Sequence, residues 1–272
     1  YYDKSAPEHF QPVGETQMVT EMAAYSETDP TKATVAAIVA HADLRLENVG
    51  EVLDAHSATA AGLFRGIRHA GAHEPNPEAL YIPGRAPAGL YADRDFRRGV
   101  AELGERGLTY DTWHYHHQNR DFMDMAREVH GTKMILDHFG TPLGVGQYEG
   151  QRDAIFAQWK EDVAEISDCP NVFAKLGGMA MPDNGYGWHD RAMPPTSDEF
   201  VEAQAPWYHH MIDCFGPERC MFESNFPVDK ASISYRVLWN GLKKIAAEYD
   251  DAAQTAMFSG TARRVYRIEA PG

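Results

Sequence analysis

The segment KMILDHFGTP, residues 133–142, shows how the chain is organised, because an apolar run ends in two polar residues and is then broken. Lys133–His138 has the length and composition of a buried strand in a parallel sheet, and Gly140 and Pro142 end it. In barrels of alternating strands and helices, catalytic groups occupy such strand ends. His138 is therefore a candidate for metal binding, for hydrogen bonding to a substrate carbonyl or for proton transfer, with a purely structural histidine as the alternative.

Five further segments have the same strand character. The six predicted strands are Val35–Ala42, Leu63–His69, Leu108–His117, Lys133–His138, Val172–Gly177 and Arg219–Ser224. Apolar residues spaced by three and four follow each of them, as at Phe122, Met125, Ala126 and Val129, and predict amphipathic helices. Strict alternation of strands and helices predicts an α/β protein built of parallel units.

The loops favour a barrel over an open sheet. Connections from strand to helix are long at residues 70–93, 139–153 and 178–198, whereas connections from helix to strand are short, which is typical of a (β/α)8 TIM-type barrel. A doubly wound open sheet is the alternative, but the sequence has no GxGxxG or Walker motif. Because only six strands are found, we expect residues 1–272 to form a single barrel domain lacking the first two strands, with edges that another segment, a helix or a second subunit covers.

The composition is that of a globular protein with an acidic surface. The 272 residues (30.4 kDa) contain 25 Lys and Arg against 40 Asp and Glu, a net charge of −15. This charge disfavours nucleic acids and anionic membrane surfaces as partners, and no apolar run approaches the ~20 residues of a membrane helix. Three cysteines without a CxxC motif indicate a reducing, cytoplasmic compartment. The expected partners are a small-molecule substrate and, in a homo-oligomer, further copies of the chain.

Two further strand ends carry groups suited to chemistry. The sequence WHYHHQ at residues 113–118 places His114 and His116 on one face of the predicted strand, although two histidines alone do not make a metal site and a polar loop is the alternative. Arg68, in FRGIRH at residues 64–69, is a candidate for binding an anion through its planar guanidinium group, with a surface ion pair as the alternative.

A buried carboxylate on the last strand needs a partner. Glu223 and Asn225 face the same way at the end of Arg219–Ser224, and an unpaired buried carboxylate is very costly. Lys175, on the preceding strand, is the expected partner of Glu223. Exposure of both side chains to solvent is the alternative.

Four segments together resemble the amidohydrolase-related (amidohydrolase 2) family, which includes 2-pyrone-4,6-dicarboxylate lactonase, sugar lactonases and aminocarboxymuconate-semialdehyde decarboxylase. The segments are FRGIRH at 64–69, LDHFGTP at 136–142, NVFAKLGG at 171–178 and RCMFESNFPVD at 219–229. The resemblance implies a distorted (β/α)8 barrel that hydrolyses lactone, ester or amide bonds, or decarboxylates its substrate.

The resemblance also assigns residues. His116 is similar to the histidine of strand five and His138 to that of strand six, while Asn225 stands where the family usually has an aspartate that serves as general base. An amide cannot accept that proton. Some members use one divalent metal, typically zinc, but the H-x-H motif of the first strand has no counterpart here. Two imidazoles and an amide are a poor set for zinc, so we expect no metal in this chain.

The resulting prediction is a hydrolase that acts on a small carboxylated lactone or ester. Its expected catalytic residues are His138, which polarises the scissile carbonyl, His116, which acts as the base, and Asn225, which orients the water. The expected substrate-binding residues are Arg68, Trp113 and Lys175. A non-oxidative decarboxylase on the same barrel and a non-catalytic ligand-binding relative are the alternatives.

Overall fold

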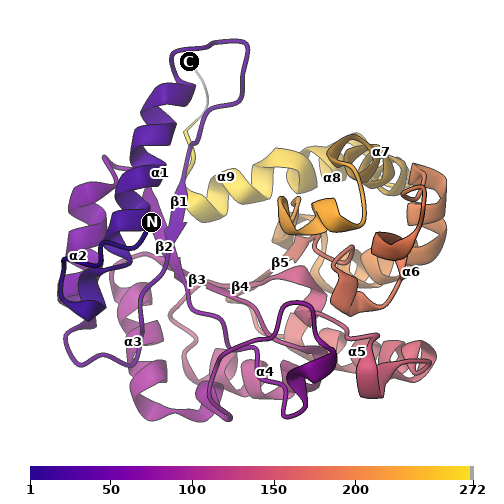
Figure 1. Ribbon diagram of the computed structural model, residues 1–272, viewed down its shortest axis with the longest axis horizontal. Coiled ribbons are helices and arrows are strands. Elements are labelled where there is room, and N and C mark those ends of the chain that lie inside the picture. The colour runs from indigo at the N-terminus through magenta and orange to yellow at the C-terminus, as the bar shows by residue number, and fades with distance from the viewer. Residues whose placement is uncertain (270–272) are drawn as a thin grey trace.

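The strands of the computed structural model, which describes residues 1–269, form one parallel sheet in the order β1–β2–β3–β4–β5–β6. The strands are β1 Ile38–Ala40, β2 Phe64–Arg68, β3 Thr109–Thr112, β4 Met134–Leu136, β5 Val172–Leu176 and β6 Cys220–Phe222. Each strand pairs with the next along the chain, and the sheet curls into a half-barrel (Figure 1). The predicted six consecutive parallel strands are confirmed. A closed barrel of eight strands is not formed by the described residues.

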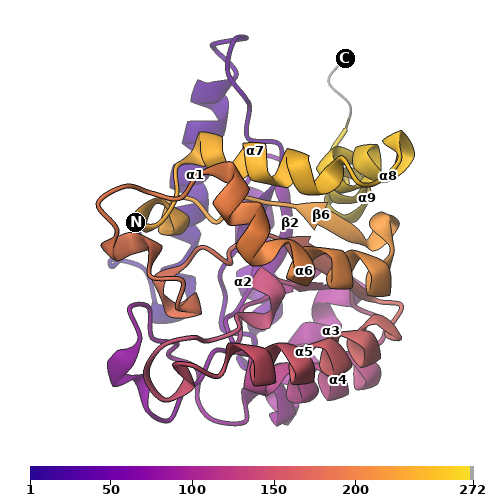
Figure 2. The ribbon, with the colours of Figure 1, turned by 90° about the vertical axis from the view of Figure 1, so that its right-hand side faces the viewer.

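The helices follow the strands and cover mainly the outer face of the curled sheet. They are α1 Val13–Ser26, α2 Val49–Thr59, α3 Arg94–Glu105, α4 Asn119–Glu128, α5 Arg152–Ser167, α6 Ser197–Phe215, α7 Tyr235–Ala246, α8 Asp251–Thr255 and α9 Thr261–Tyr266. Figures 1 and 2 show α2 to α6 around the outside of the sheet. Phe96, Phe122 and Trp159 of this outer layer are almost completely buried in the main core, as the predicted apolar stripes require.

A second, smaller core lies on the inner face of the sheet. Ile135 of β4 and Met221 of β6 pack there with Val265 and Tyr266 of α9. Strand side chains alternate between the two faces, so Ile135 shares its face with Asp137, and Met221 shares its face with Glu223. The inner face is therefore apolar around α9 and polar towards the carboxyl ends of the strands.

The observed strands are shorter than the predicted ones at their carboxyl ends. The sequence predicts a single strand over Leu108–His117, but β3 ends at Thr112 and residues His116–Gln118 form a short 3₁₀ turn. The Trp113 carbonyl accepts a hydrogen bond from Gly71 N (2.8 Å), and His116 N donates to Thr141 O (3.3 Å). Hydrogen bonds to neighbouring loops thus replace the hydrogen bonds between strands after Thr112. The expectation that His114 and His116 share a strand face is wrong.

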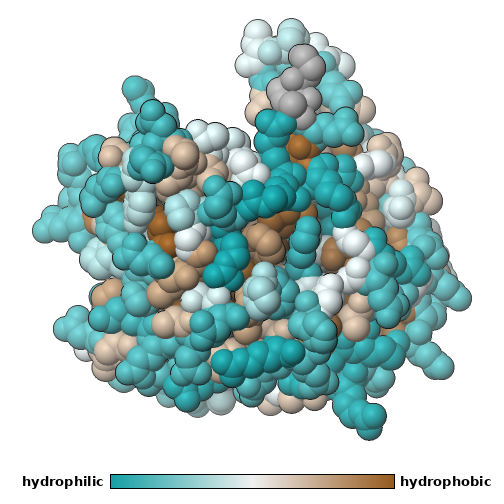
Figure 3. All heavy atoms as spheres, turned by 180° about the vertical axis from the view of Figure 1, so that it is seen from behind, coloured by the Kyte–Doolittle hydropathy of each residue, from teal (hydrophilic) through white to brown (hydrophobic). Residues whose placement is uncertain are grey.

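The surface contains no broad apolar region in the view of Figure 3, where hydrophilic residues surround small hydrophobic areas. None of the helices within residues 1–269 is both long and apolar enough to cross a membrane.

Candidate active site

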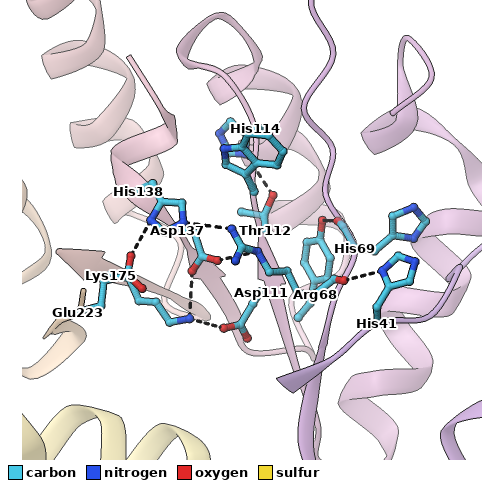
Figure 4. A network of polar contacts seen from close by, with 12 residues as sticks. His41, Arg68, His69, Asp111, Thr112, His114, Asp137, His138, Lys175 and Glu223 are labelled. Atoms are coloured by element: carbon cyan, nitrogen blue, oxygen red, sulfur yellow. Dashed lines mark hydrogen bonds and ion pairs between the residues drawn. The ribbon is translucent and has the colours of Figure 1, made fainter. Parts of the chain in front are cut away.

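Charged side chains from five neighbouring strands converge on the inner face of the half-barrel (Figure 4). They are Arg68 at the end of β2, Asp111 in β3, Asp137 and His138 after β4, Lys175 in β5 and Glu223 after β6. The carboxyl ends of parallel strands meet at one rim, which is where barrel enzymes place their chemistry. The strand alternation seen in the sequence therefore explains why these residues, separated by up to 155 positions, lie together.

Lys175 is held by two aspartates. Its Nζ lies 2.7 Å from Asp111 Oδ2 and 3.2 Å from Asp137 Oδ1, and Tyr266 donates to the same Asp111 oxygen at 2.5 Å. Burial alone would lower the pKa of Lys175, but the charges of Asp111 and Asp137 raise it well above its ordinary value. Lys175 is therefore a charged ammonium group inside the protein, neutralised by its partners.

The expected direct ion pair between Lys175 and Glu223 is wrong. Lys175 lies opposite Met221 in the register of β5 and β6, so Glu223 lies two residues nearer the rim. Glu223 instead contacts His138, with 2.7 Å between Oε1 and Nδ1. Sequence spacing placed both charges on one face correctly, but it did not provide the register that separates them.

Arg68 joins His138 to Asp137. Its terminal Nη2 donates to His138 Nε2 at 3.0 Å, and its Nε lies 3.3 Å from Asp137 Oδ2. Burial opposes the charge of Arg68, but Asp137, Glu223 and Asp111 outweigh it and raise the pKa. The side chain is still 41% exposed, so the guanidinium group can also reach a ligand. Burial likewise raises the pKa of Asp137, against the opposing charges of Lys175 and Arg68.

The hydrogen-bond pattern fixes the tautomer of His138. Arginine has only donors, so Nε2 of His138 must accept and the ring is neutral with its proton on Nδ1. Nδ1 faces Glu223. Burial raises the pKa of this carboxyl group, but the contact with His138 and the charges of Lys175 and Arg68 outweigh burial and lower the pKa to about 2. A carboxylate beside one imidazole nitrogen, with the other nitrogen directed away from it, is the arrangement of a general base and its orienting group.

The backbone around His138 is unusual. His138, Phe139 and Thr141 have φ values of 55°, 59° and 38°, in the left-handed region that is unfavourable for residues with side chains. Gly178 has φ 83°, and a Cβ atom there would lie 2.2 Å from His138 Nδ1. Strained backbone of this kind clusters at functional sites, and only glycine at position 178 leaves room for the imidazole.

The other predicted catalytic residues lie apart from His138. The His116 ring accepts from Leu143 N at Nδ1 (3.3 Å), and burial lowers its pKa to about 4. Asn225 donates to Asp229 Oδ1 at 3.4 Å. In residues 1–269, no hydrogen bond or ion pair joins His116 or Asn225 to His138.

Trp113, predicted to bind substrate, contacts the segment that follows His138. Its Nε1 donates to Thr141 Oγ1 at 3.0 Å, and its side chain is partly exposed. His116 and Trp113 thus both support the strained turn after β4. The structure brings together Arg68, His138 and, through Asp137, Lys175.

A second polar cluster connects the loops around the rim. The buried carboxylate of Glu74 accepts hydrogen bonds from Gln147 Nε2 (2.9 Å) and Tyr148 OH (2.9 Å) and lies 3.1 Å from His117 Nε2. These four residues come from the loops that follow β2, β3 and β4. A single carboxylate therefore connects three loops.

Sequence reasoning missed Asp111, Tyr266, Asp229 and Glu74. Alternation within β3 contained a signal for Asp111, because Thr109 and Asp111 share a face of that strand. The other three residues lie outside the strands, so no periodicity in the sequence indicates that they face the strand ends.

The described residues do not form a zinc site. Among residues 1–269, no group of three or more His, Cys, Asp or Glu side chains could hold a metal ion. Both nitrogens of His138 face protein groups, Arg68 and Glu223, and Lys175 lies against both Asp111 and Asp137. Cationic side chains therefore already contact the carboxylates that a metal ion would need.

Comparisons with known proteins agree with this architecture. A family model described as amidohydrolase matches residues 8–268. An uncharacterized protein of Sinorhizobium fredii, y4mH, is 32% identical over 236 residues, which cover 85% of this chain and 69% of the relative.

Two further matches come from Burkholderia multivorans. An L-fucono-1,5-lactonase is 27% identical over 241 residues, which cover 88% of this chain and 74% of the relative. The crystal structure of an amidohydrolase with bound zinc superimposes with a TM-score of 0.75 at 25% identity, covering 94% of this chain and 80% of that one.

Proposed function

The chain belongs to the amidohydrolase family and is a hydrolase, and we propose that its substrate is a small carboxylated lactone or ester. The observation that carries this proposal is the line of contacts from Arg68 through His138 to Glu223. It combines a partly exposed cation for a substrate carboxylate with a neutral imidazole and a carboxylate that orients it. The name of the L-fucono-1,5-lactonase relative supports a lactone as the substrate.

Arg68 has two roles in this proposal. Without substrate it donates to His138 Nε2, and with substrate it turns to the substrate carboxylate, for which a guanidinium group is a matched partner. The imidazole nitrogen is then free to accept a proton. Binding of the correct substrate thereby uncovers the base.

His138 acts on the hydrolytic water. Nε2 takes a proton as the water oxygen bonds to the carbonyl carbon, and Glu223 stabilises the imidazolium ion that results. The tetrahedral intermediate then collapses, the bond to the ring or ester oxygen breaks, and His138 returns the proton to that oxygen. Lys175 holds Asp137, which in turn orients Arg68. Trp113 lies beside the turn after His138 and is proposed to form one wall of the substrate site.

The test is a panel of γ- and δ-lactones and linear esters, each with and without a carboxylate, assayed with the full-length protein. Product mass distinguishes addition of water from loss of carbon dioxide. His138→Gln is expected to lower kcat/KM by about 10²–10⁴ for the best substrate, as loss of a general base does. His130→Gln, at an exposed histidine, is the matched control and should leave the rate unchanged. Release of carbon dioxide, or full activity of His138→Gln, would overturn the proposal.

A further inference from the structure

The carbonyl group of Phe139 is bound from outside its own turn. Phe139 follows His138 directly and is completely buried, so its backbone polar groups need partners within the protein. Inside the turn, Thr141 N donates to His138 O at 2.8 Å. The Phe139 carbonyl instead accepts a hydrogen bond of 2.7 Å from the indole Nε1 of Trp159 in α5. A side chain that lies 20 residues further along the chain thus completes the turn beside His138.

Packing holds the indole of Trp159 in this position. The side chain is 1% exposed and belongs to the main core. Its ring neighbours those of Phe156, Trp207 and Phe139, with 5.8, 4.7 and 6.2 Å between the ring centroids. Side chains in a close-packed core stay in one rotamer on the time average, so the indole donor remains directed at the Phe139 carbonyl.

The turn needs this support because its backbone conformation is unfavourable. His138 and Phe139 have φ values of 55° and 59°, and residues with side chains keep such a conformation only where the surrounding structure imposes it. Trp113, which donates to Thr141 Oγ1, supports the far end of the turn. Trp159 supports Phe139, the residue next to His138. The two indole groups therefore hold the turn at different points.

The conformation of this turn decides where the imidazole of His138 points, because φ and ψ set the direction of the bond from Cα to Cβ. In the observed conformation, Nε2 lies 3.0 Å from Arg68 Nη2 and Nδ1 lies 2.7 Å from Glu223 Oε1 (Figure 4). The backbone of Gly178 lies so close that an added Cβ atom would overlap the ring. Hydrogen bonds weaken steeply with misalignment, so a small rotation of the peptide group after His138 would disrupt both contacts.

We propose that Trp159 is a positioning residue for His138: its indole N–H holds the Phe139 carbonyl, and the turn that is fixed in this way keeps the imidazole between Arg68 and Glu223. The inference rests on the proposed function for its effect on the rate, because His138 is the general base in that function. Trp159 acts through the turn, since α5 lies on the outside of the sheet and the charged site lies on the inner face (Figure 1).

Trp159→Phe removes the donor and keeps an aromatic ring in the core. Phenylalanine has no N–H, so the buried carbonyl of Phe139 loses its partner. A buried acceptor without a partner is costly, and the turn therefore relaxes towards a conformation in which this carbonyl is bound again. The imidazole of His138 moves with the turn and loses its contacts with Arg68 and Glu223.

The direct test is nitrogen NMR of the His138 ring in the full-length protein near neutral pH. In the wild type, Nδ1 should have the shift of a protonated nitrogen and Nε2 that of an acceptor. In Trp159→Phe, both shifts should move towards the average of the two tautomers, because the contacts that select one tautomer are lost. Trp239→Phe is the matched control: the buried Nε1 of Trp239 has no hydrogen-bond partner within residues 1–269, so the wild-type shifts should remain.

The same change should appear in the kinetics of the best substrate from the lactone and ester panel. A misplacement of about 1 Å in an active site costs on the order of 10²-fold in rate, so kcat of Trp159→Phe should fall about 10²-fold. KM should change little, because Arg68 keeps its contact with Asp137 (3.3 Å) and can still bind the substrate carboxylate. Trp239→Phe should leave both constants unchanged. Partial unfolding would lower the amount of active enzyme but would leave the ring shifts of the folded molecules unchanged.

The outcomes separate this inference from the proposed function. Wild-type ring shifts in Trp159→Phe overturn the role of Trp159, whether or not lactones are hydrolysed. Altered shifts with an unchanged kcat, or without any lactonase or esterase activity, overturn the proposed function and leave the positioning role standing. If Trp159→Phe does not fold, β-(3-benzothienyl)alanine at position 159 decides by the same shifts, because it replaces the indole N–H with sulfur and keeps the two fused rings.

Discussion

The hydroxyl of Tyr266 and the ammonium of Lys175 bind the same oxygen of Asp111, at 2.5 Å and 2.7 Å. Tyr266 lies in α9, which begins 149 residues after β3 ends. The contact therefore joins α9, near the end of the described chain, to β3 in the sheet. Asp111 is fully buried, and these two partners satisfy its carboxylate inside the protein.

Lys175→Met should destabilise the fold strongly. Removing one member of a buried ion pair leaves the other charge uncompensated and costs about 3–5 kcal/mol. The double variant with Asp111→Asn should recover part of this loss, because it removes one of the two stranded carboxylates. The free energy of unfolding in urea measures both effects, and Lys230→Met, at an exposed position, serves as the control. An unchanged stability of Lys175→Met would show that the pair contributes nothing.

Arg68→Gln should act mainly on binding. If the guanidinium contact with the substrate carboxylate is equally strong in the ground and transition states, KM rises while kcat changes little. The effect should be large for carboxylated lactones and small for their uncarboxylated analogues. Steady-state kinetics on matched pairs of substrates checks this, with Arg236→Gln at an exposed position as the control. Equal effects on both members of a pair would rule out the anchoring role.

Glu223 should make the protein more stable above about pH 4.5 than near pH 2. Burial opposes ionisation, but His138 and the nearby cations lower the pKa of Glu223 from 4.5 to about 2. A carboxyl group with a lowered folded-state pKa contributes stability above its unfolded value, and loses it as the pH falls through the folded value. The shift corresponds to a contribution on the order of 3 kcal/mol at neutral pH.

Acid unfolding of Glu223→Gln checks this prediction. The variant should be less stable than the wild type at pH 7, and the difference should shrink as the pH falls from 4.5 towards 2. Glu202→Gln, at an exposed position of α6, should follow the wild type throughout. A difference that is independent of pH would mean that the charge of Glu223 does not contribute.

Gly178→Ala should impair the site more than the strain of a left-handed backbone conformation alone would. Position 178 has φ 83°, and its new Cβ would meet His138 Nδ1. Gly187→Ala is a matched control, because Gly187 also has a positive φ (65°) but no atom of residues 1–269 lies within 4 Å of the added Cβ. The control should lose about 1–2 kcal/mol of stability and keep its activity, since it carries only the left-handed strain. Gly178→Ala should lose more stability and most of its activity, and equal behaviour of the two variants would contradict the close packing at His138.

The sequence predicted the sheet well because its signals are local. Each predicted strand has an apolar run with a glycine, a proline or polar residues after it, and such a run specifies a buried strand without knowledge of its neighbours. The carboxyl ends of the strands were placed less well. At Trp113 and His116, hydrogen bonds to Gly71 and Thr141 end the ladder, and no local pattern encodes partners so distant in the chain.

The sequence predicted where the site lies, at the carboxyl ends of the strands, but not which of its side chains contact one another. Arg68, His138 and Lys175 were identified because polar and charged residues are rarely buried at the ends of apolar strands unless they have partners or a function. Their pairing depends on register, which placed Lys175 against Asp111 and Glu223 against His138. Contributions from outside the strands, such as that of Tyr266 to Asp111, become visible only in the folded chain.

Glu74 has a further consequence for how specificity can change. Its carboxylate is bound by His117, Gln147 and Tyr148, so the loops that follow β2, β3 and β4 are coupled in their conformation. A deletion or substitution that changes the conformation of one loop displaces the shared carboxylate. The hydrogen bonds of that carboxylate then change the conformation of the other two loops. A change of substrate specificity would then require coordinated substitutions in all three loops. A substitution in one loop alone would first make the three loops less ordered.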